Sequence, residues 1–299
     1  MNYDLYRTFY YVATYKSFTR AAAALFTSQP AVSRAVQKLE AELGCLLFVR
    51  APSGVECTRE GEQLYLYVSA AHNCLLKGED ELSRSADPGS GHIYIGATVT
   101  ALYGLLLGHL DDFHKQHPAV RYKISTGSTN HVIEMLKNGA VDLAFVSTPC
   151  RAAKPLRTAI LGEFHDILIA GQGYAALSGR PLRLEELARY PLVCLRQGMQ
   201  LREFIDDFFA ARGLPVSVDI ELDGADRIVP LVGRGLGLGF VPQRMAQEAL
   251  DRGEVFRVAL EEELPPRQIC MLTDPRRPRT QASRAFVHAI RGTFEAKDT

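Results

Sequence analysis

The first 44 residues repeat apolar and polar positions largely with the period of an α-helix. The apolar stripe of the first predicted helix consists of Leu5, Tyr6, Phe9, Val12 and Ala13. An alanine-rich run at residues 18–25 predicts a second helix, for which Ser17 or Thr19 is available as the N-cap. These two helices lead into a segment whose pattern carries more information.

A third helix is predicted between Ser28 and Gly44. Ser28 is its N-cap, Pro30 lies in its first turn, and Gly44 ends it. Its apolar residues are Val32, Val36, Leu39 and Leu43. Its opposite face carries Gln29, Ser33, Arg34, Gln37 and Lys38. Two helices joined by a short turn, the second polar and basic outside, predict a helix-turn-helix that reads a DNA major groove. The alternative is an ordinary helical hairpin whose outer face is merely solvated.

The next twelve residues predict a β-hairpin wing, which favours the DNA-binding interpretation. An apolar run at 46–49 is followed by turn chemistry at 50–54 and by a returning strand at 55–57. Arg50 is placed to meet a phosphate or a minor groove. The whole segment therefore predicts a winged helix-turn-helix.

This segment resembles the N-terminal domain of the LysR-type transcriptional regulators. The family shows a Ser-Phe-Thr-x-Ala-Ala opening, a Ser-Gln-Pro-Ala-x-Ser turn, Leu-Glu-x-x-Leu-Gly, Leu-Phe-x-Arg and Thr-x-x-Gly, and this chain has them at 17–22, 28–33, 39–44, 47–50 and 58–61. The wing departs from the family, because residues 51–54 read Ala-Pro-Ser-Gly where a basic loop is more usual. The resemblance implies double-stranded promoter DNA and RNA polymerase as partners.

Polar side chains of the third helix and its flanks are the candidate DNA contacts. Glutamine and arginine suit bidentate contacts with adenine and guanine, so Gln29, Ser33 and Arg34 are predicted to read base edges. The complete set of predicted DNA-binding residues is Thr27, Ser28, Gln29, Pro30, Ser33, Arg34, Lys38 and Arg50.

A heptad pattern follows the wing and predicts a linker helix. Its seam positions are Leu64, Val68, Ala71, Leu75 and Leu82, with Gly78 in the remaining slot. One interpretation is a helix that packs on its own domain. The resemblance implies instead a helix that pairs subunits into a homo-oligomer, a dimer or a tetramer. Residues 86–91 break the pattern and predict a hinge.

Beyond the hinge, strands alternate with helices, which predicts an α/β fold with a mostly parallel sheet. Strands are expected at 92–98, 120–126, 141–147, 167–170, 192–195, 219–222, 238–241 and 267–272, and helices at 102–114, 131–138, 182–188, 200–212, 226–234 and 280–294. Two α/β subdomains with a return to the first resemble the periplasmic-binding-protein-like effector module of the same family. The expected crossovers lie near 156–161 and 260–266. The predicted domains are 1–60 (winged helix-turn-helix), 61–90 (linker helix and hinge), 91–161 with 267–299 (effector subdomain I) and 162–266 (effector subdomain II).

Hydroxyl residues follow all three strands of the first subdomain, where ligands of open α/β sheets bind. Each could be a plain helix cap, but three such ends at one sheet edge favour a small-ligand site. The candidate effector-binding residues are Thr98, Thr100, Ser128, Thr129, Ser147 and Thr148, faced by residues 196–201 and 223–224, of which Arg196, Gln200 and Asp223 are the main candidates. Hydroxyls and helix amides suit an anion, for which a carboxylate is the prediction, and Arg196 or Arg202 could add a fixed charge.

Charge is balanced overall, with 34 basic and 34 acidic residues, so composition alone does not indicate a nucleic-acid binder. The first 50 residues nevertheless contain more basic than acidic side chains, as phosphate contact requires. No apolar stretch reaches about 18 residues, and the N-terminus shows no secretory signal, so a cytoplasmic protein without membrane contact is expected.

No motif predicts catalysis, a cofactor or a metal. The glycine run at 233–239 lacks Gly-Lys-[Ser/Thr] and leads into a strand, whereas a phosphate loop opens a helix. The histidines at 109, 114 and 117 lack the spacing and acidic partner of a zinc enzyme. A ligand-responsive DNA-binding regulator is the leading interpretation. The alternatives are a solute-binding protein, which leaves the N-terminal module without a purpose, and an enzyme, which lacks a catalytic pair.

Overall fold

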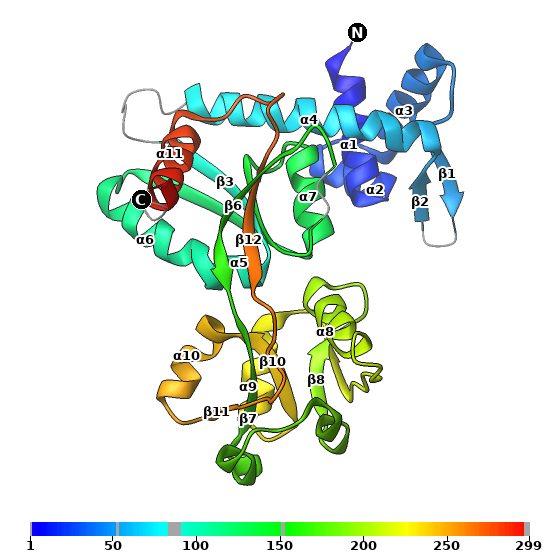
Figure 1. Ribbon diagram of the computed structural model, residues 1–299. Coiled ribbons are helices and arrows are strands. Elements are labelled where there is room, and N and C mark those ends of the chain that lie inside the picture. The colour runs from blue at the N-terminus through cyan, green and yellow to red at the C-terminus, as the bar shows by residue number, and fades with distance from the viewer. Residues whose placement is uncertain (1, 52–53, 83–90, 151–152, 296–299) are drawn as a thin grey trace. The chain divides into compact units, whose positions relative to one another are not determined.

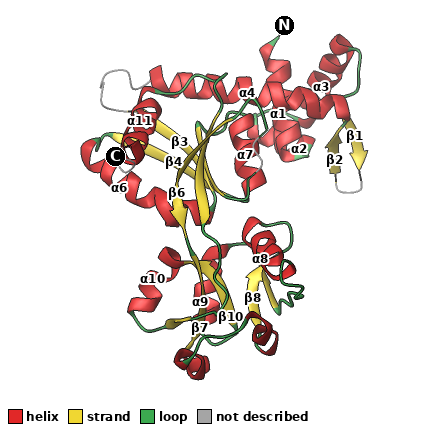
Figure 2. Cartoon of the chain, viewed as in Figure 1, coloured by secondary structure: helices red, strands yellow, loops and turns green. Residues whose placement is uncertain are grey.

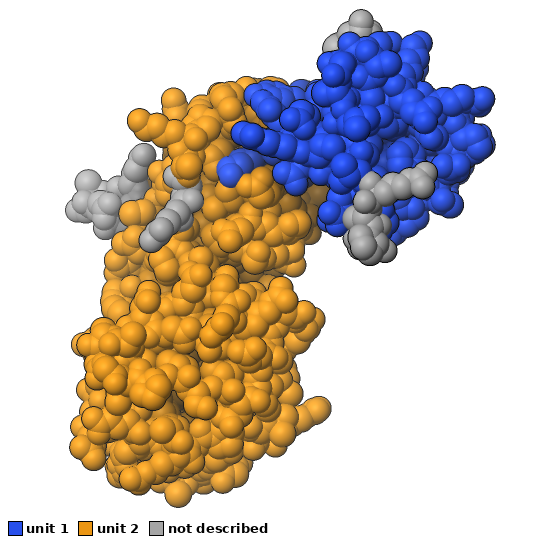
Figure 3. Space-filling model, turned by 90° about the vertical axis from the view of Figure 1, so that its right-hand side faces the viewer, with its two compact units in different colours: residues 1–85, 137–140 blue, residues 86–136, 141–299 orange. Residues whose placement is uncertain are grey.

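The computed structural model describes residues 2–51, 54–82, 91–150 and 153–295. Internal contacts divide the chain into two compact units, residues 1–85 with 137–140 and residues 86–136 with 141–299 (Figure 3). The hinge predicted at 86–91 lies outside the described residues except for its last residue. The predicted domain limits stay predictions.

The first unit begins with three helices, α1 (Tyr3–Tyr15), α2 (Phe18–Ala24) and α3 (Gln29–Leu43) (Figure 1). Of the two predicted caps for α2, Ser17 is used, since its hydroxyl accepts a hydrogen bond from the Arg20 backbone N–H at 3.3 Å. Ser28 occupies the N-cap of α3, but its hydroxyl makes no capping hydrogen bond. Gly44 ends α3 with φ of 72°, a conformation that glycine adopts at no steric cost.

Apolar faces of these helices form the core of the first unit. One group of buried residues consists of Leu5, Phe9, Leu39, Leu47 and Val68, and a second of Val12, Ala21, Ala22, Val32 and Val36. The Phe48 ring packs on both, with its centroid 5.3 Å from that of Phe9 and 5.9 Å from that of Phe18. This packing turns the remaining face of α3 toward solvent.

The predicted wing is present as the antiparallel pair β1 (Phe48–Ala51) and β2 (Gly54–Cys57). Its first strand is fastened to α3 by Glu40, whose carboxylate accepts hydrogen bonds from the backbone N–H groups of Leu47 at 2.7 Å and Phe48 at 3.3 Å.

The linker helix α4 (Arg59–Leu82) uses its predicted seam in two different ways. Val68 is buried in the core of its own unit and Leu64 packs against that core, which agrees with the alternative interpretation for this part of the helix. Leu75 and Leu82 are 50% and 76% exposed, and Tyr67, the residue before Val68, is 71% exposed. Only the later part of the heptad pattern is therefore available to a partner.

Two five-stranded sheets form the second unit (Figures 1 and 2). The strand order of the first is β4-β3-β5-β12-β6, built from β3 (Gly91–Ala97), β4 (Val120–Thr126), β5 (Leu143–Ser147), β6 (Arg157–Phe164) and β12 (Arg267–Thr273). As predicted, β3 is parallel to β4 and β5, but β12 is antiparallel to both of its neighbours, so the sheet is mixed rather than uniformly parallel.

Helices cover both faces of this first sheet. They are α5 (Val99–Ala101), the π-helical turn η1 (Leu102–Leu106), α6 (Leu107–Gln116), α7 (Thr129–Lys137) and α11 (Gln281–Glu295). Ile93 and Ile95 of β3 share a core cluster with residues of α6 and α11. Gly96 faces α7 on the other side, where a Cβ would meet Val132. Because successive side chains of β3 point to opposite faces of the sheet, α6 and α11 cover one face and α7 covers the other.

The second sheet has the order β11-β7-β10-β8-β9. Its strands are β7 (Asp166–Gly171), β8 (Leu192–Leu195), β9 (Ile220–Leu222), β10 (Leu238–Pro242) and β11 (Val255–Val258). Its helices are α8 (Gln200–Ala210), α9 (Ile228–Gly233), α10 (Gln243–Asp251) and the 3₁₀ turns η2 (Gln172–Gly179), η3 (Leu184–Arg189) and η4 (Ala225–Arg227). The α-helix predicted at 182–188 is thus a 3₁₀ helix, and the prediction lacked β11.

A buried ion pair lies where the chain passes between the sheets. The crossover predicted near 156–161 is wrong, because residues 157–161 belong to β6, and the chain crosses between Phe164 and Asp166. It returns at Arg267, the first residue of β12. Arg267 donates to the Asp166 carboxylate at 2.6 and 2.9 Å, and its guanidinium stacks 4.7 Å from the ring centroid of Phe164 and 5.0 Å from that of Phe204.

Within the described part of the chain, none of the helices combines the length and hydrophobicity needed to cross a bilayer.

The Thr-x-x-Gly element has a steric explanation that yields a prediction. A Cβ on Gly61 would clash with the carbonyl oxygen of Leu47, whereas a Cβ on Gly78 of the same helix meets no atom within 4 Å. Gly61→Ala should therefore destabilise the first unit by about 1–3 kcal/mol through overpacking. Gly78→Ala should be neutral or stabilising by up to about 1 kcal/mol. Thermal melting followed by circular dichroism measures both; equal melting profiles for the two variants would contradict this explanation.

Candidate nucleic-acid interface and ligand cavity

The outward face of α3 carries the side chains predicted to contact DNA. Because Val32, Val36 and Leu39 are buried, the helix turns its polar side to solvent. Thr27, Ser28, Gln29, Pro30, Arg34 and Lys38 are exposed and Ser33 is half-buried. Arg50 lies in β1, but its side chain is outside what the structure describes. The structure thus brings the predicted residues of α3 and of the preceding turn onto one surface.

Hydrogen-bonding groups on this surface are free to bind a ligand. Among the described residues, Arg34 and Lys38 make no ion pair, and the Ser28 hydroxyl makes no capping bond at the helix N-terminus. A free hydroxyl beside unpaired helix amides is suited to a phosphate. Amide and guanidinium groups one turn further on are suited to base edges.

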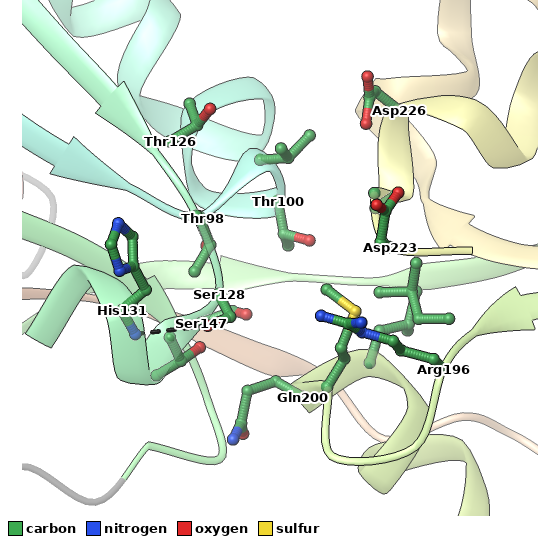
Figure 4. A pocket seen from close by; sticks show the side chains of 18 of the residues that line it. Thr98, Thr100, Thr126, Ser128, His131, Ser147, Arg196, Gln200, Asp223 and Asp226 are labelled. Carbon is green, nitrogen blue, oxygen red and sulfur yellow. Dashed lines mark hydrogen bonds between the residues drawn. The ribbon is translucent and has the colours of Figure 1, made fainter. Parts of the chain in front are cut away.

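A cavity of about 470 Å³ opens between the two sheets of the second unit. The first subdomain contributes the ends of β3, β4 and β5 and the start of α7, and the second contributes the β8–α8 and β9–η4 loops. Figure 4 shows the hydroxyl-bearing residues Thr98, Ser128 and Ser147 on one side and Arg196 and Asp223 on the other.

Nearly all the predicted effector residues line this cavity. They are Thr98, Thr100, Ser128, Thr129, Ser147, Arg196, Gln200 and Asp223. Thr148 does not: its hydroxyl accepts a hydrogen bond from the Gln268 backbone N–H at 2.8 Å and ties the chain to β12. That part of the prediction is wrong because the strand β5 ends at Ser147, and the next side chain points toward a neighbouring strand.

Two of the cavity hydroxyls already cap helices. The Thr98 hydroxyl accepts from the Ala101 N–H at 3.2 Å, and the Ser128 hydroxyl accepts from the His131 N–H at 3.3 Å. Each retains further hydrogen-bonding capacity, since a hydroxyl carries one donor and two lone pairs.

Other polar groups on the cavity wall have no partner among the described residues. The hydroxyl of Thr129, a residue only 4% exposed, makes no hydrogen bond, nor does the buried Gln200 Oε1. Helix α8 begins without a side-chain cap, so its first amides are also unpaired. Arg196 is exposed, makes no ion pair within the described chain, and extends toward the cavity in Figure 4. The Thr129 hydroxyl, the first amides of α8 and the Arg196 guanidinium are donors and favour an anion, whereas Gln200 Oε1 can only accept a hydrogen bond.

Arg202 does not supply the extra charge that the sequence allowed. It is 5% exposed and donates to Asp206 at 2.8 Å, to Glu221 at 2.9 Å and to the Leu195 carbonyl at 3.2 Å. Its guanidinium is therefore engaged with α8, β8 and β9, and Arg202 is not among the residues that line the cavity.

Several cavity residues were not predicted. They are Val99, Thr126, Gly127, Asn130, His131, Leu195, Ala225, Asp226 and Arg227. Asp226 and Arg227 could have been found, since they follow Asp223 in the loop after a strand. Asp223 forms an ion pair with Arg227. Within the described chain, no group of three or more His, Cys, Asp or Glu residues is arranged to hold a metal ion.

Two family descriptions match most of the chain. "Bacterial regulatory helix-turn-helix protein, lysR family" matches residues 3–62, and "LysR substrate binding domain" matches residues 86–295. The transcriptional regulator CysB of Burkholderia cenocepacia is 32% identical over 241 residues, which cover 79% of this chain and 76% of that protein. The transcriptional regulator cbl of Escherichia coli is 30% identical over 236 residues, covering 78% and 74%.

Solved structures share the fold. Full-length CbnR in complex with its target DNA superimposes with a TM-score of 0.72 at 18% identity, over 98% of this chain and all of that one (100%). A full-length OxyR variant of Pseudomonas aeruginosa gives a TM-score of 0.68 at 23% identity, over 97% and 95% of the two chains.

Proposed function

Because the chain belongs to the LysR family of transcriptional regulators, we propose that it recognises an operator through α3 and responds to a small anionic effector in the cavity between its two sheets. The observation that carries this proposal is the concentration of unpaired donors at both places. Regulators of this family bind promoter DNA and small-molecule effectors. The family consists of transcriptional regulators, and we assign no reaction to the cavity.

In the DNA complex, Gln29, Ser33 and Arg34 read base edges while Thr27, Ser28, Lys38 and Arg50 position the phosphate backbone. Pro30 starts the helix between them. The exposure of the α3 residues and the absence of ion pairs at Arg34 and Lys38 among the described residues support this division. The chain acts in the cytoplasm, where promoter DNA and RNA polymerase are its partners.

Replacing Arg34 and Lys38 separates base reading from backbone contact. Arg34→Ala should weaken specific binding by about 1–3 kcal/mol and relax the preference at one base pair. Lys38→Ala should weaken binding to all DNA sequences alike and reduce the slope of log affinity against log salt concentration by about 1. Fluorescence anisotropy on matched and mismatched duplexes measures both. Unchanged affinity and unchanged preference for Arg34→Ala would rule out its role in base reading.

We further propose that the exposed stripe of α4 joins subunits into a dimer, which assembles into a tetramer. The stripe consists of the exposed residues Tyr67, Ala71, Leu75 and Leu82. One winged helix offers little contact area, whereas a pair reads two half-sites on one face of the duplex. Exposed apolar side chains at helical spacing support this surface.

Leu75→Glu should disrupt the pairing, because it places a charge in the apolar stripe. Leu66→Glu is a matched control, since Leu66 is 48% exposed against 50% for Leu75 but lies on another face of the helix. Multi-angle light scattering should show a smaller assembly for Leu75→Glu alone. A monomeric mass for the unmodified chain at micromolar concentration would refute the dimer.

Loss of the Thr100 hydroxyl tests the effector cavity. Thr100 is 6% exposed and lines the cavity, so Thr100→Val removes a hydroxyl at nearly constant volume. An effector at 100 times its dissociation constant should stabilise the unmodified chain by about 2.7 kcal/mol, and the variant by less. A thermal-shift screen of metabolic acids measures this, with Thr158→Val on exposed β6 as the control. If Thr100→Val responds to a found effector like the unmodified chain, the site is misplaced.

A further inference from the structure

The two walls of the cavity differ in the charge that they can bind. On the second-sheet side, the β9–η4 loop carries two carboxylates, those of Asp223 and Asp226 (Figure 4). Asp223 is neutralised by its ion pair with Arg227. Asp226 is exposed and has no hydrogen bond or ion pair with any described residue. The loop therefore presents one free negative charge to the cavity.

Unused donors dominate the rest of the wall. The starts of α7 and α8, each more than two turns long, open onto the cavity. Thr129, the deeply buried first residue of α7, has a hydroxyl with no hydrogen-bond partner among the described residues. Arg196 adds one free positive charge. These groups favour a negative group on the ligand, because helix N-termini and guanidinium both stabilise anions.

A ligand that is only anionic would use one wall and meet an uncompensated carboxylate on the other. Arg196 and Arg227 balance Asp223 and Asp226, so the charged lining of the cavity is neutral as a whole. Repulsion from an unpaired charge is an efficient way to reject the wrong ligand. A ligand that carries both charges would satisfy both walls.

We propose that the effector is one of the common L-amino acids, which carry a carboxylate and a protonated amine, and that Asp226 binds the amine. This inference rests on the proposed effector cavity and narrows its ligand from anions in general to zwitterions. The carboxylate lies toward Arg196 and the helix starts. A cavity of about 470 Å³ is in the range that takes small molecules.

The first test compares ligands that differ by the amine alone. The full-length protein is titrated calorimetrically with each of the twenty common L-amino acids and with the same carbon skeletons lacking the amine. At least one amino acid should bind, and loss of its amine should weaken binding about tenfold or more, as expected for a hydrogen bond to a charged group. Equal or tighter binding of the deaminated acid would overturn the proposal, as would the absence of binding by every amino acid.

The second test assigns the amine to Asp226. Asp226→Asn should weaken binding of the amino acid about tenfold and leave the deaminated acid unchanged or tighter. Asp207→Asn on α8 is the control, since Asp207 is exposed and does not line the cavity. Equal losses for both ligands, or none for the amino acid, would overturn the role of Asp226.

The two substitutions distinguish a wrong ligand class from a wrong binding site. If the ligand is a simple anion, Thr100→Val weakens carboxylate binding while Asp226→Asn does not. If the effector binds elsewhere, neither substitution changes the binding of either ligand.

Discussion

The buried ion pair between Asp166 and Arg267 is the constraint on which the second unit depends. Asp166 begins β7, with which the chain enters the second sheet, and Arg267 begins β12, with which it returns to the first. Arg267 is 2% exposed. Two buried charges far apart in sequence must meet for either to be tolerated, and breaking such a pair typically costs about 3–5 kcal/mol. The rings of Phe164 and Phe204 enclose the guanidinium. The ion pair thereby holds the starts of β7 and β12 together where the chain passes between the two sheets.

Placing the crossovers there leaves the strand ends of the two sheets facing each other across the cavity. One helix takes part in both regions: the first turn of α8 lines the cavity, and Phe204 of the same helix packs on Arg267. A ligand that contacts α8 therefore meets an element that is also attached to the crossover. A ligand can shift a conformational equilibrium only through contacts that differ between the states, and α8 offers such contacts.

Sequence patterns predicted most of this architecture because strong periodicity and strand ends are local signals. The apolar face of α3, the wing and the hydroxyls after β3, β4 and β5 follow from spacing alone. Strand β6 was mistaken for a crossover because it lies at a sheet edge, where Ile160 is 58% exposed and the alternation is weak. Heptad spacing could not reveal that Val68 packs on its own unit, since the same period serves both uses.

The remaining differences concern tertiary partners. Arg202 and Thr148 have side chains that suit a ligand. Both instead form hydrogen bonds with residues that are distant in sequence, Arg202 with Glu221 and Thr148 with Gln268. Asp226 was not predicted because its importance depends on the absence of a partner. Its carboxylate makes no hydrogen bond or ion pair with another described residue, and the sequence cannot show this. Residue types therefore indicated the candidate site. Hydrogen bonds and ion pairs within the fold decide which of its side chains can still bind a ligand.

Thermodynamic linkage between the cavity and the operator is the most direct test of this account. The dissociation constant of the cavity ligand should be measured with and without saturating operator DNA, and that of the DNA with and without saturating ligand. If the cavity controls DNA binding, both constants change, and by the same factor. A ligand affinity that is identical in the presence and absence of operator DNA would contradict it.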